Sequence, residues 1–98
     1  MPGSRAYRLS PLAEADLEEI WLYTFKRWSL EQADSYLASI VDAFEGLASG
    51  VKTGKSVEVR DGYFKYAVGS HVVFYRLTED SIDIMRILHQ RMDVGRHL

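Results

Sequence analysis

The stretch that most constrains this chain runs from Ser81 to His89 and reads Ser-Ile-Asp-Ile-Met-Arg-Ile-Leu-His. Its apolar residues fall on both parities of an extended chain, Ile82, Ile84 and Leu88 on one and Met85 and Ile87 on the other. Successive side chains of a strand point to opposite faces, so this pattern is typical of a strand that is covered on both sides. The stretch therefore predicts a strand inside a sheet.

Polar side chains gather where this strand should leave the sheet. Arg86 interrupts the apolar run, and His89 and Arg91 follow at its end. Each also has a purely structural interpretation: Arg86 can pair with an acid such as Asp83 or Glu58, His89 can cap the strand, and Arg91 can be solvated. We expect a functional site, if the chain has one, at this end.

The first half of the chain predicts a short strand followed by two helices. Ala6 to Leu9 is the strand, and Ser10-Pro11 is a typical helix start because Ser accepts from a free N–H and Pro suits the first helical position. This helix should end near Arg27. Its predicted apolar face consists of Leu17, Ile20, Trp21, Thr24 and Trp28, with both tryptophans packed in the protein.

The second helix should begin directly after the first. Ser29-Leu30-Glu31-Gln32 has the pattern of a capping box, and Gly50 is placed to end the helix in a left-handed residue. Its helical-period residues are Ala33, Tyr36, Leu37, Ile40, Val41, Phe44, Leu47 and Ala48. Two helices joined so closely form an antiparallel hairpin, which needs a further layer to bury its apolar face.

Three β-rich runs follow, from Tyr63 to Val68, His71 to Thr78 and Ser81 to His89, separated by turns that are long enough only for hairpins. A short edge strand at 57–59 is also expected. The predicted fold is α+β, in the order β-α-α-β-β-β, with the helical hairpin on one face of a mainly antiparallel sheet. The side chains expected to be largely buried are Leu17, Trp21, Leu37, Ile40, Phe44, Phe74 and Ile84.

Apolar and aromatic residues on both parities of the three runs exceed what one helical layer requires. Either the sheet curves about its own core or a partner covers the second face, since exposed apolar patches of this kind usually mark interfaces. The tail at 93–98 is expected to be frayed and too short to cover that face.

Length and composition limit the remaining possibilities. Ninety-eight residues allow one domain, here 1–98, and the absence of cysteine leaves no disulfide or thiolate metal site. Residues 1–5 show no apolar leader behind them, and no apolar run approaches a membrane span, so we expect a cytoplasmic protein. Acids outnumber bases by four up to Gly50, whereas bases outnumber acids by two from Val51 onward. The net charge of −2 argues against a general nucleic-acid binder.

Several landmarks together resemble one known family. They are Tyr7-Arg8-Leu9-Ser10 before a helix, the second helix from Ser29, Gly62 with Tyr63, Val73-Phe74-Tyr75, and Arg-Ile-Leu-His-Gln-Arg-Met-Asp at 86–93. Their order resembles the ParE branch of the RelE/ParE toxin family over nearly the whole chain. The resemblance implies a type II toxin that inhibits DNA gyrase by protein–protein binding, arrests growth and is neutralised by a ParD-like antitoxin in a hetero-oligomer.

The other branch of that family, the ribosome-dependent mRNA endonucleases of the RelE kind, is the alternative. The arginine that the nucleases carry before the Val-Tyr of the third strand falls at Val72, and their C-terminal tyrosine falls around Arg96 or His97. Arg91 matches its counterpart, and His89 could act as acid or base because its ordinary pKa lies near ~6.5. The resemblance therefore favours a non-catalytic protein; if it is an enzyme, it is a metal-independent endoribonuclease.

We accordingly expect no catalytic residue, no metal and no cofactor. The residues expected to bind the target are Arg86, His89, Arg91, Arg60 and Lys65. We expect the antitoxin and gyrase as partners, with no membrane contact and no sequence-specific binding of nucleic acid by this chain alone.

Overall fold

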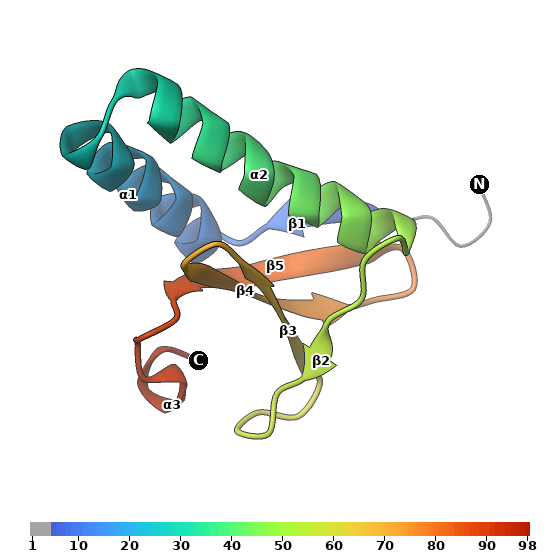
Figure 1. Ribbon diagram of the computed structural model, residues 1–98. Helices are drawn as coiled ribbons and strands as arrows, with labels where there is room; N and C mark the ends of the chain where they lie inside the picture. The colour runs from blue at the N-terminus through green and yellow to red at the C-terminus, as the bar shows by residue number, and fades with distance from the viewer. Residues whose placement is uncertain (1–4) are drawn as a thin grey trace.

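Five strands form one sheet, and two long helices lie side by side on one of its faces (Figure 1). The computed structural model describes residues 5–98. The elements are β1 (Ala6–Leu9), α1 (Pro11–Arg27), α2 (Leu30–Ser49), β2 (Lys55–Ser56), β3 (Tyr63–Val68), β4 (His71–Leu77), β5 (Ser81–His89) and α3 (Val94–His97). The expectation that no apolar leader stands at the start of the chain falls largely on residues 1–4, which lie outside the described residues.

The strand order is β1-β5-β4-β3-β2, so β5 has a neighbour on each side. It pairs parallel with β1 and antiparallel with β4, and the other pairs are antiparallel. The predicted β-α-α-β-β-β order, the helical hairpin on one face of the sheet and the inner position of Ser81–His89 are confirmed. The predicted edge strand is displaced: pairing with β3 occurs at Lys55–Ser56, and Val57 is instead buried in the loop that follows.

A β-bulge explains why the apolar residues of β5 change parity. Phe74 pairs with Arg86 and Tyr75 with Ile84, which leaves Met85 as the extra residue of β5. An extra residue shifts the alternation by one. Ile84 before the bulge and Ile87 after it therefore both face the helices, within the same core cluster.

The buried stripe of α1 is rotated from the predicted one. Its buried residues are Ala13, Asp16, Ile20 and Thr24. Leu17 and Trp21, predicted to be buried, are only half-buried, and Trp28 is 67% exposed, so the prediction that it packs in the core is wrong. The physical reason is that the helical period alone does not choose between adjacent faces. The stripe that faces the sheet contains Asp16, which binds Arg86 and the Ile87 N–H of β5.

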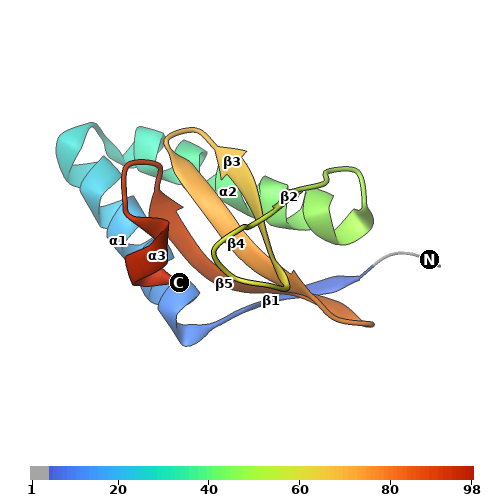
Figure 2. The same ribbon diagram turned by 90° about the horizontal axis from the view of Figure 1, so that it is seen from below.

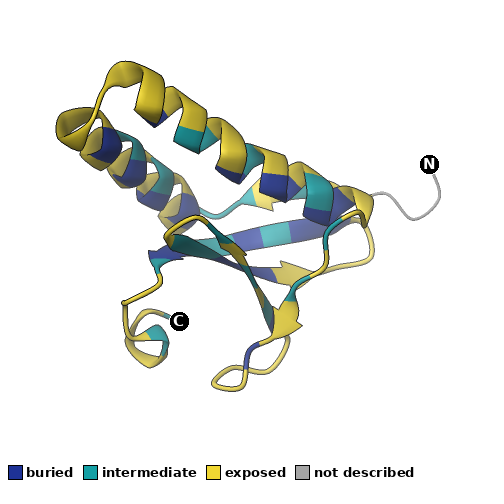
Figure 3. Cartoon of the chain, viewed as in Figure 1, coloured by how far each residue is buried: buried dark blue, intermediate teal, exposed yellow. Residues whose placement is uncertain are grey.

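The second helix follows the prediction more closely. Ser29 Oγ accepts from the Gln32 N–H at 3.0 Å, and Gly50 ends α2 with a φ of 84°. Ile40 and Phe44 are buried on the side that faces the sheet, as Figure 3 shows for the inner surface of the hairpin, whereas Leu37 is half-buried. Phe74 and Ile84 are buried as predicted.

The opposite face of the sheet carries a second, smaller core. Its buried members are Val57, Tyr63, Phe74 and Leu88, and Val94 and Leu98 pack against them. The tail at 93–98 is thus a short helix, α3, on that face (Figure 2), not the frayed end that the sequence predicted. Local polarity suggested fraying; contact with the aromatic and aliphatic residues of the second core outweighs it.

Beyond Leu9, β1 no longer covers the edge of β5, and side chains from the start of α1 replace it. Ser10 Oγ donates to the Met85 carbonyl at 2.8 Å, and Asp16 Oδ2 accepts from the Ile87 N–H at 2.9 Å. Both Asp16 carboxylate oxygens also accept from Arg86, from Nε at 2.8 Å and Nη2 at 2.9 Å. The Asp16 hydrogen bond raises the pKa of Arg86. The partner of Arg86 is therefore neither Asp83 nor Glu58, the acids considered from the sequence.

This bidentate pair predicts a large effect for one substitution. Asp16 is 8% exposed, so Asp16→Ala should lower the free energy of unfolding by about 3 kcal/mol, since the change leaves Arg86 and the Ile87 N–H without their acceptor. Urea denaturation measures it. The control is Arg8→Ala, which breaks the exposed Arg8–Asp83 pair between β1 and β5 and should cost less than about 1 kcal/mol. Equal losses for the two variants would contradict the assignment.

Candidate functional site

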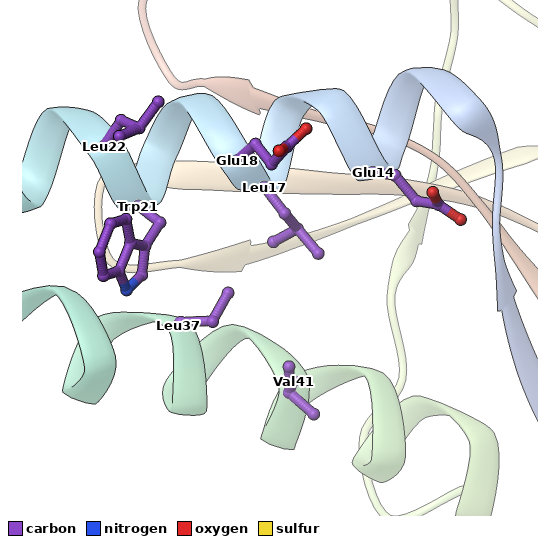
Figure 4. Close-up of a pocket in the computed structure, with 7 residues that line it drawn as sticks. All are labelled: Glu14, Leu17, Glu18, Trp21, Leu22, Leu37 and Val41. Carbon is purple, nitrogen blue, oxygen red and sulfur yellow. The ribbon is translucent and has the colours of Figure 1, made fainter.

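An apolar groove runs between α1 and α2, on the face of the hairpin that points away from the sheet (Figure 4). It encloses about 530 Å³ and is lined by Glu14, Leu17, Glu18, Trp21, Leu22, Leu37 and Val41. The rotation of α1 creates it, because Leu17 and Trp21 point toward α2 instead of the sheet. Cavities of this size are ordinary for ligand sites.

The groove has an ordered apolar floor and an acidic rim on α1. The Trp21 indole Nε1–H donates to Asp34 Oδ1 at 3.0 Å, and the Trp21 ring stacks on Phe25 with centroids 5.3 Å apart. Glu14 and Glu18 stand along the α1 edge, as Figure 4 shows. The surface therefore suits an apolar segment that also carries basic side chains.

Other large apolar side chains near the end of α1 and at the turn between the helices are also exposed. They are Tyr23, Phe25, Trp28 and Leu30. Single exposed apolar residues are ordinary, but several of them close together in sequence beside an apolar groove favour an interaction surface.

The predicted target-binding residues lie in three separate places. His89 and Arg91 are together at the end of β5, where His89 Nδ1 accepts from the Arg91 N–H at 3.1 Å. The Arg91 side chain is exposed, and its guanidinium has no hydrogen-bond acceptor among residues 5–98. Among residues 5–98, Arg91 thus presents an exposed cation without an ion-pair partner.

Arg86 and Arg60 both contact the last residues of the chain. Arg86 Nη1 donates to the His97 carbonyl at 3.2 Å in addition to its pair with Asp16, and Arg60 Nη1 donates to the Leu98 carbonyl. The Arg60 guanidinium also lies over the Tyr63 ring, 4.7 Å from its centroid. These arginines hold α3 in place.

Lys65 lies apart from the other four. It is exposed on β3, directly opposite Lys55 of β2 in the antiparallel register. A role for the five residues in target binding stays a prediction, and the geometry groups only His89 with Arg91.

Two residues that sequence reasoning did not single out complete the end of the sheet. Tyr36 Oη lies 2.6 Å from His71 Nδ1, and the His71 ring meets the His89 ring edge-on with centroids 5.3 Å apart. Burial, and then the neighbouring His89, lower the pKa of His71. The signal available in the sequence was the β4–β5 hairpin itself, which places the first residue of β4 opposite the last residue of β5.

Residues 5–98 contain no group of three or more His, Cys, Asp or Glu side chains arranged to hold a metal ion. No helix in the same range combines the length and apolar character needed to cross a membrane.

Known proteins resemble this chain over nearly its whole length. The sequence profile of the family described as "ParE toxin of type II toxin-antitoxin system, parDE" matches residues 7–94. The protein named Toxin ParE1 from Mycobacterium tuberculosis (strain ATCC 25618 / H37Rv) is 48% identical over 97 residues, which cover 97% of this chain and 99% of that protein. Toxin ParE1 from Caulobacter vibrioides is 43% identical over 95 residues, covering 96% and 98%.

Solved structures show the same fold. The chromosomal ParDE toxin–antitoxin system from P. aeruginosa contains a chain that superimposes with a TM-score of 0.77 at 20% identity, covering 89% of this chain and 97% of that one. The toxin–antitoxin complex RelBE2 from Mycobacterium tuberculosis contains one with a TM-score of 0.65 at 22% identity, covering 89% and 99%. With the profile and the sequence relatives, these findings establish that the chain belongs to the ParE family of toxins of type II toxin–antitoxin systems.

Proposed function

We propose that this toxin inhibits DNA gyrase and is neutralised by a ParD-like antitoxin, one segment of which covers the groove between α1 and α2. The observation that carries the antitoxin part is the groove itself. It is about 530 Å³ in volume, has an apolar floor of Leu17, Trp21, Leu37 and Val41, and lies on a hairpin that also exposes Tyr23, Phe25 and Trp28.

The residues that line the groove indicate which side chains the antitoxin segment should carry. Glu14 and Glu18 along the α1 edge favour a segment with Lys or Arg beside its apolar residues. An amphipathic helix laid between two helices meets both requirements, because it presents one apolar face and charged flanks. A segment that folds as it binds would bury about 1,000 Å² or more and give a large negative heat-capacity change.

The gyrase part of the proposal rests on the family membership and on the end of β5. Arg91 is an exposed guanidinium in a turn that the His89 ring orders through the Arg91 N–H. A planar guanidinium binds carboxylate or phosphate in a bidentate manner. We propose that Arg91 contacts such a group of the gyrase–DNA complex, with no bond made or broken by the toxin.

The antitoxin proposal predicts different effects for two exposed leucines of α1. Leu22 lines the groove and is 46% exposed, whereas Leu12 lies outside it and is 59% exposed. Leu22→Glu should weaken binding of the antitoxin encoded by the neighbouring gene by at least about tenfold, because it places a carboxylate against the apolar segment. Leu12→Glu should change it little. Isothermal titration calorimetry measures both, and an equal loss for the two variants would place the antitoxin elsewhere.

The gyrase proposal predicts that Arg91→Ala removes gyrase poisoning without unfolding the protein, since an exposed arginine contributes little to stability. Arg91→Lys should restore activity only in part, because lysine cannot form the bidentate contact. The measurement is the amount of gyrase-cleaved plasmid at matched protein concentration, with the melting temperature of each variant recorded.

The charge-matched control is Arg8→Ala, which removes an arginine opposite Asp83, near the start of β5 and at the other end of that strand from Arg91, and should leave poisoning intact. If folded Arg91→Ala still stabilises cleaved DNA, gyrase is contacted elsewhere on the toxin. If the wild-type protein instead cuts ribosome-bound mRNA in a reaction that requires His89, the endonuclease alternative replaces this proposal.

A further inference from the structure

A second depression, which we call the tip cleft, lies where the end of α1 meets the ends of β4 and β5. Two adjoining cavities of about 540 and 380 Å³ form it, and both are lined by Tyr23, His71 and His89. The first also touches Glu19, and the second touches Arg27 and Trp28. None of these residues lines the groove between the helices.

The floor of the tip cleft presents the Nε2 atoms of two imidazole rings. The lowered pKa of His71 favours its neutral ring, and the Tyr36 hydroxyl lies 2.6 Å from its Nδ1 and 3.1 Å from the Val68 carbonyl oxygen, so the His71 Nε2 can serve as donor or acceptor according to the tautomer. His89 Nδ1 accepts from the Arg91 N–H, which leaves its Nε2 to donate. Neither Nε2 has a hydrogen-bond partner among residues 5–98.

The walls are aromatic and cationic at one end. Tyr23 is 66% exposed and Trp28 is 67% exposed, so each offers a ring face to solvent. The Arg27 guanidinium lies 5.5 Å from the centroid of the Trp28 ring, and Arg91 follows directly after the floor residues. A large aromatic ring exposed to this degree beside a cation and a polar floor has the composition of a stacking site.

The acids of the tip cleft lie at the opposite end from Trp28. Asp16 faces the first cavity, but Arg86 neutralises it through two hydrogen bonds. Glu19 therefore supplies the one uncompensated carboxylate among the described lining residues, and it lines only the cavity away from Arg27. A ligand that fits has an anion toward Arg27, a flat ring beside Tyr23 or Trp28, and hydrogen-bonding atoms over the two imidazoles.

We propose that the tip cleft binds an unstacked nucleotide of a single-stranded nucleic acid. The base stacks on Trp28 or Tyr23, its polar edge hydrogen-bonds to the Nε2 atoms of His71 and His89, and the phosphate lies toward Arg27. Single-stranded nucleic acids are bound in this way by aromatic platforms beside cationic side chains. Stacking uses the face of any base, so the site has no sequence preference. The net charge of −2 argues against a broad basic binding surface, so the proposed contact is confined to this one cleft. The inference is independent of the identity of the toxin's target.

The test is fluorescence anisotropy of a short labelled single-stranded DNA of mixed sequence, titrated with the full-length toxin at low salt. Saturable binding is expected, accompanied by quenching of tryptophan fluorescence. Trp28→Ala should weaken binding at least about fivefold, the effect typical of losing one stacked base, and Trp28→Phe should restore most of it. Arg27→Ala should make the slope of log K against log salt concentration less steep, by about the amount that one phosphate contact contributes.

The matched control is Phe25→Ala. Phe25 is an exposed aromatic residue of α1, and it lines neither cavity of the tip cleft. It should leave DNA binding unchanged. No binding at about 0.1 mM toxin, the weak end of ordinary non-specific affinity, would overturn the proposal. So would equal losses for Trp28→Ala and Phe25→Ala. Loss of antitoxin binding in Trp28→Ala, with DNA binding unaffected, would assign the tip cleft to the protein interface instead.

Discussion

The packing of α1 on the sheet depends on the contacts that the Asp16 carboxylate makes with β5. It accepts from the backbone N–H of Ile87 and from the Arg86 side chain. One residue of α1 thus provides the hydrogen-bond acceptor for these donors in the part of β5 that β1 does not cover. A buried carboxylate is stable only when charge and hydrogen bonds compensate it, and a shift of α1 along β5 would lose both. The pair therefore fixes the position and rotation of α1 on the sheet.

That rotation determines which surfaces the molecule exposes. With Asp16 and Ile20 against the sheet, Leu17 and Trp21 turn toward α2 and form the groove, and Tyr23 and Trp28 remain in solvent beside the end of β5. The same pair orders the other face, because Arg86 also donates to the His97 carbonyl and helps to hold α3 over the second core. A single ion pair thus links the groove that we assign to the antitoxin with the end of the sheet that we assign to gyrase.

Sequence patterns predicted the elements well because local chemistry specifies them. The caps at Ser10 and Ser29, the left-handed Gly50 and the hairpin turns all act within a few residues. The face of α1 could not be predicted in this way. Asp16 shares a helical stripe with Ala13 and Ile20, but its burial depends on Arg86, which lies seventy residues away in sequence.

The difference between local and long-range contacts also explains which residues of the candidate site could be predicted from the sequence. Arg91 and His89 could be proposed from their place after the central strand and from the family resemblance. The tip cleft could not, because His71, Tyr36 and Trp28 come from three elements that only the fold brings to one end of the sheet. The role of Met85 as the bulged residue likewise depends on the β4–β5 register, although the parity change in β5 was visible in the sequence.

The central claim is that this toxin poisons gyrase and that the antitoxin prevents it. Its most direct test uses purified gyrase and plasmid DNA with wild-type toxin, with and without an equimolar amount of the antitoxin encoded by the neighbouring gene. The account predicts accumulation of gyrase-cleaved, linear plasmid with the toxin alone and none when the antitoxin is present. Unchanged gyrase activity at every toxin concentration, with growth still arrested by the toxin in cells, would contradict it.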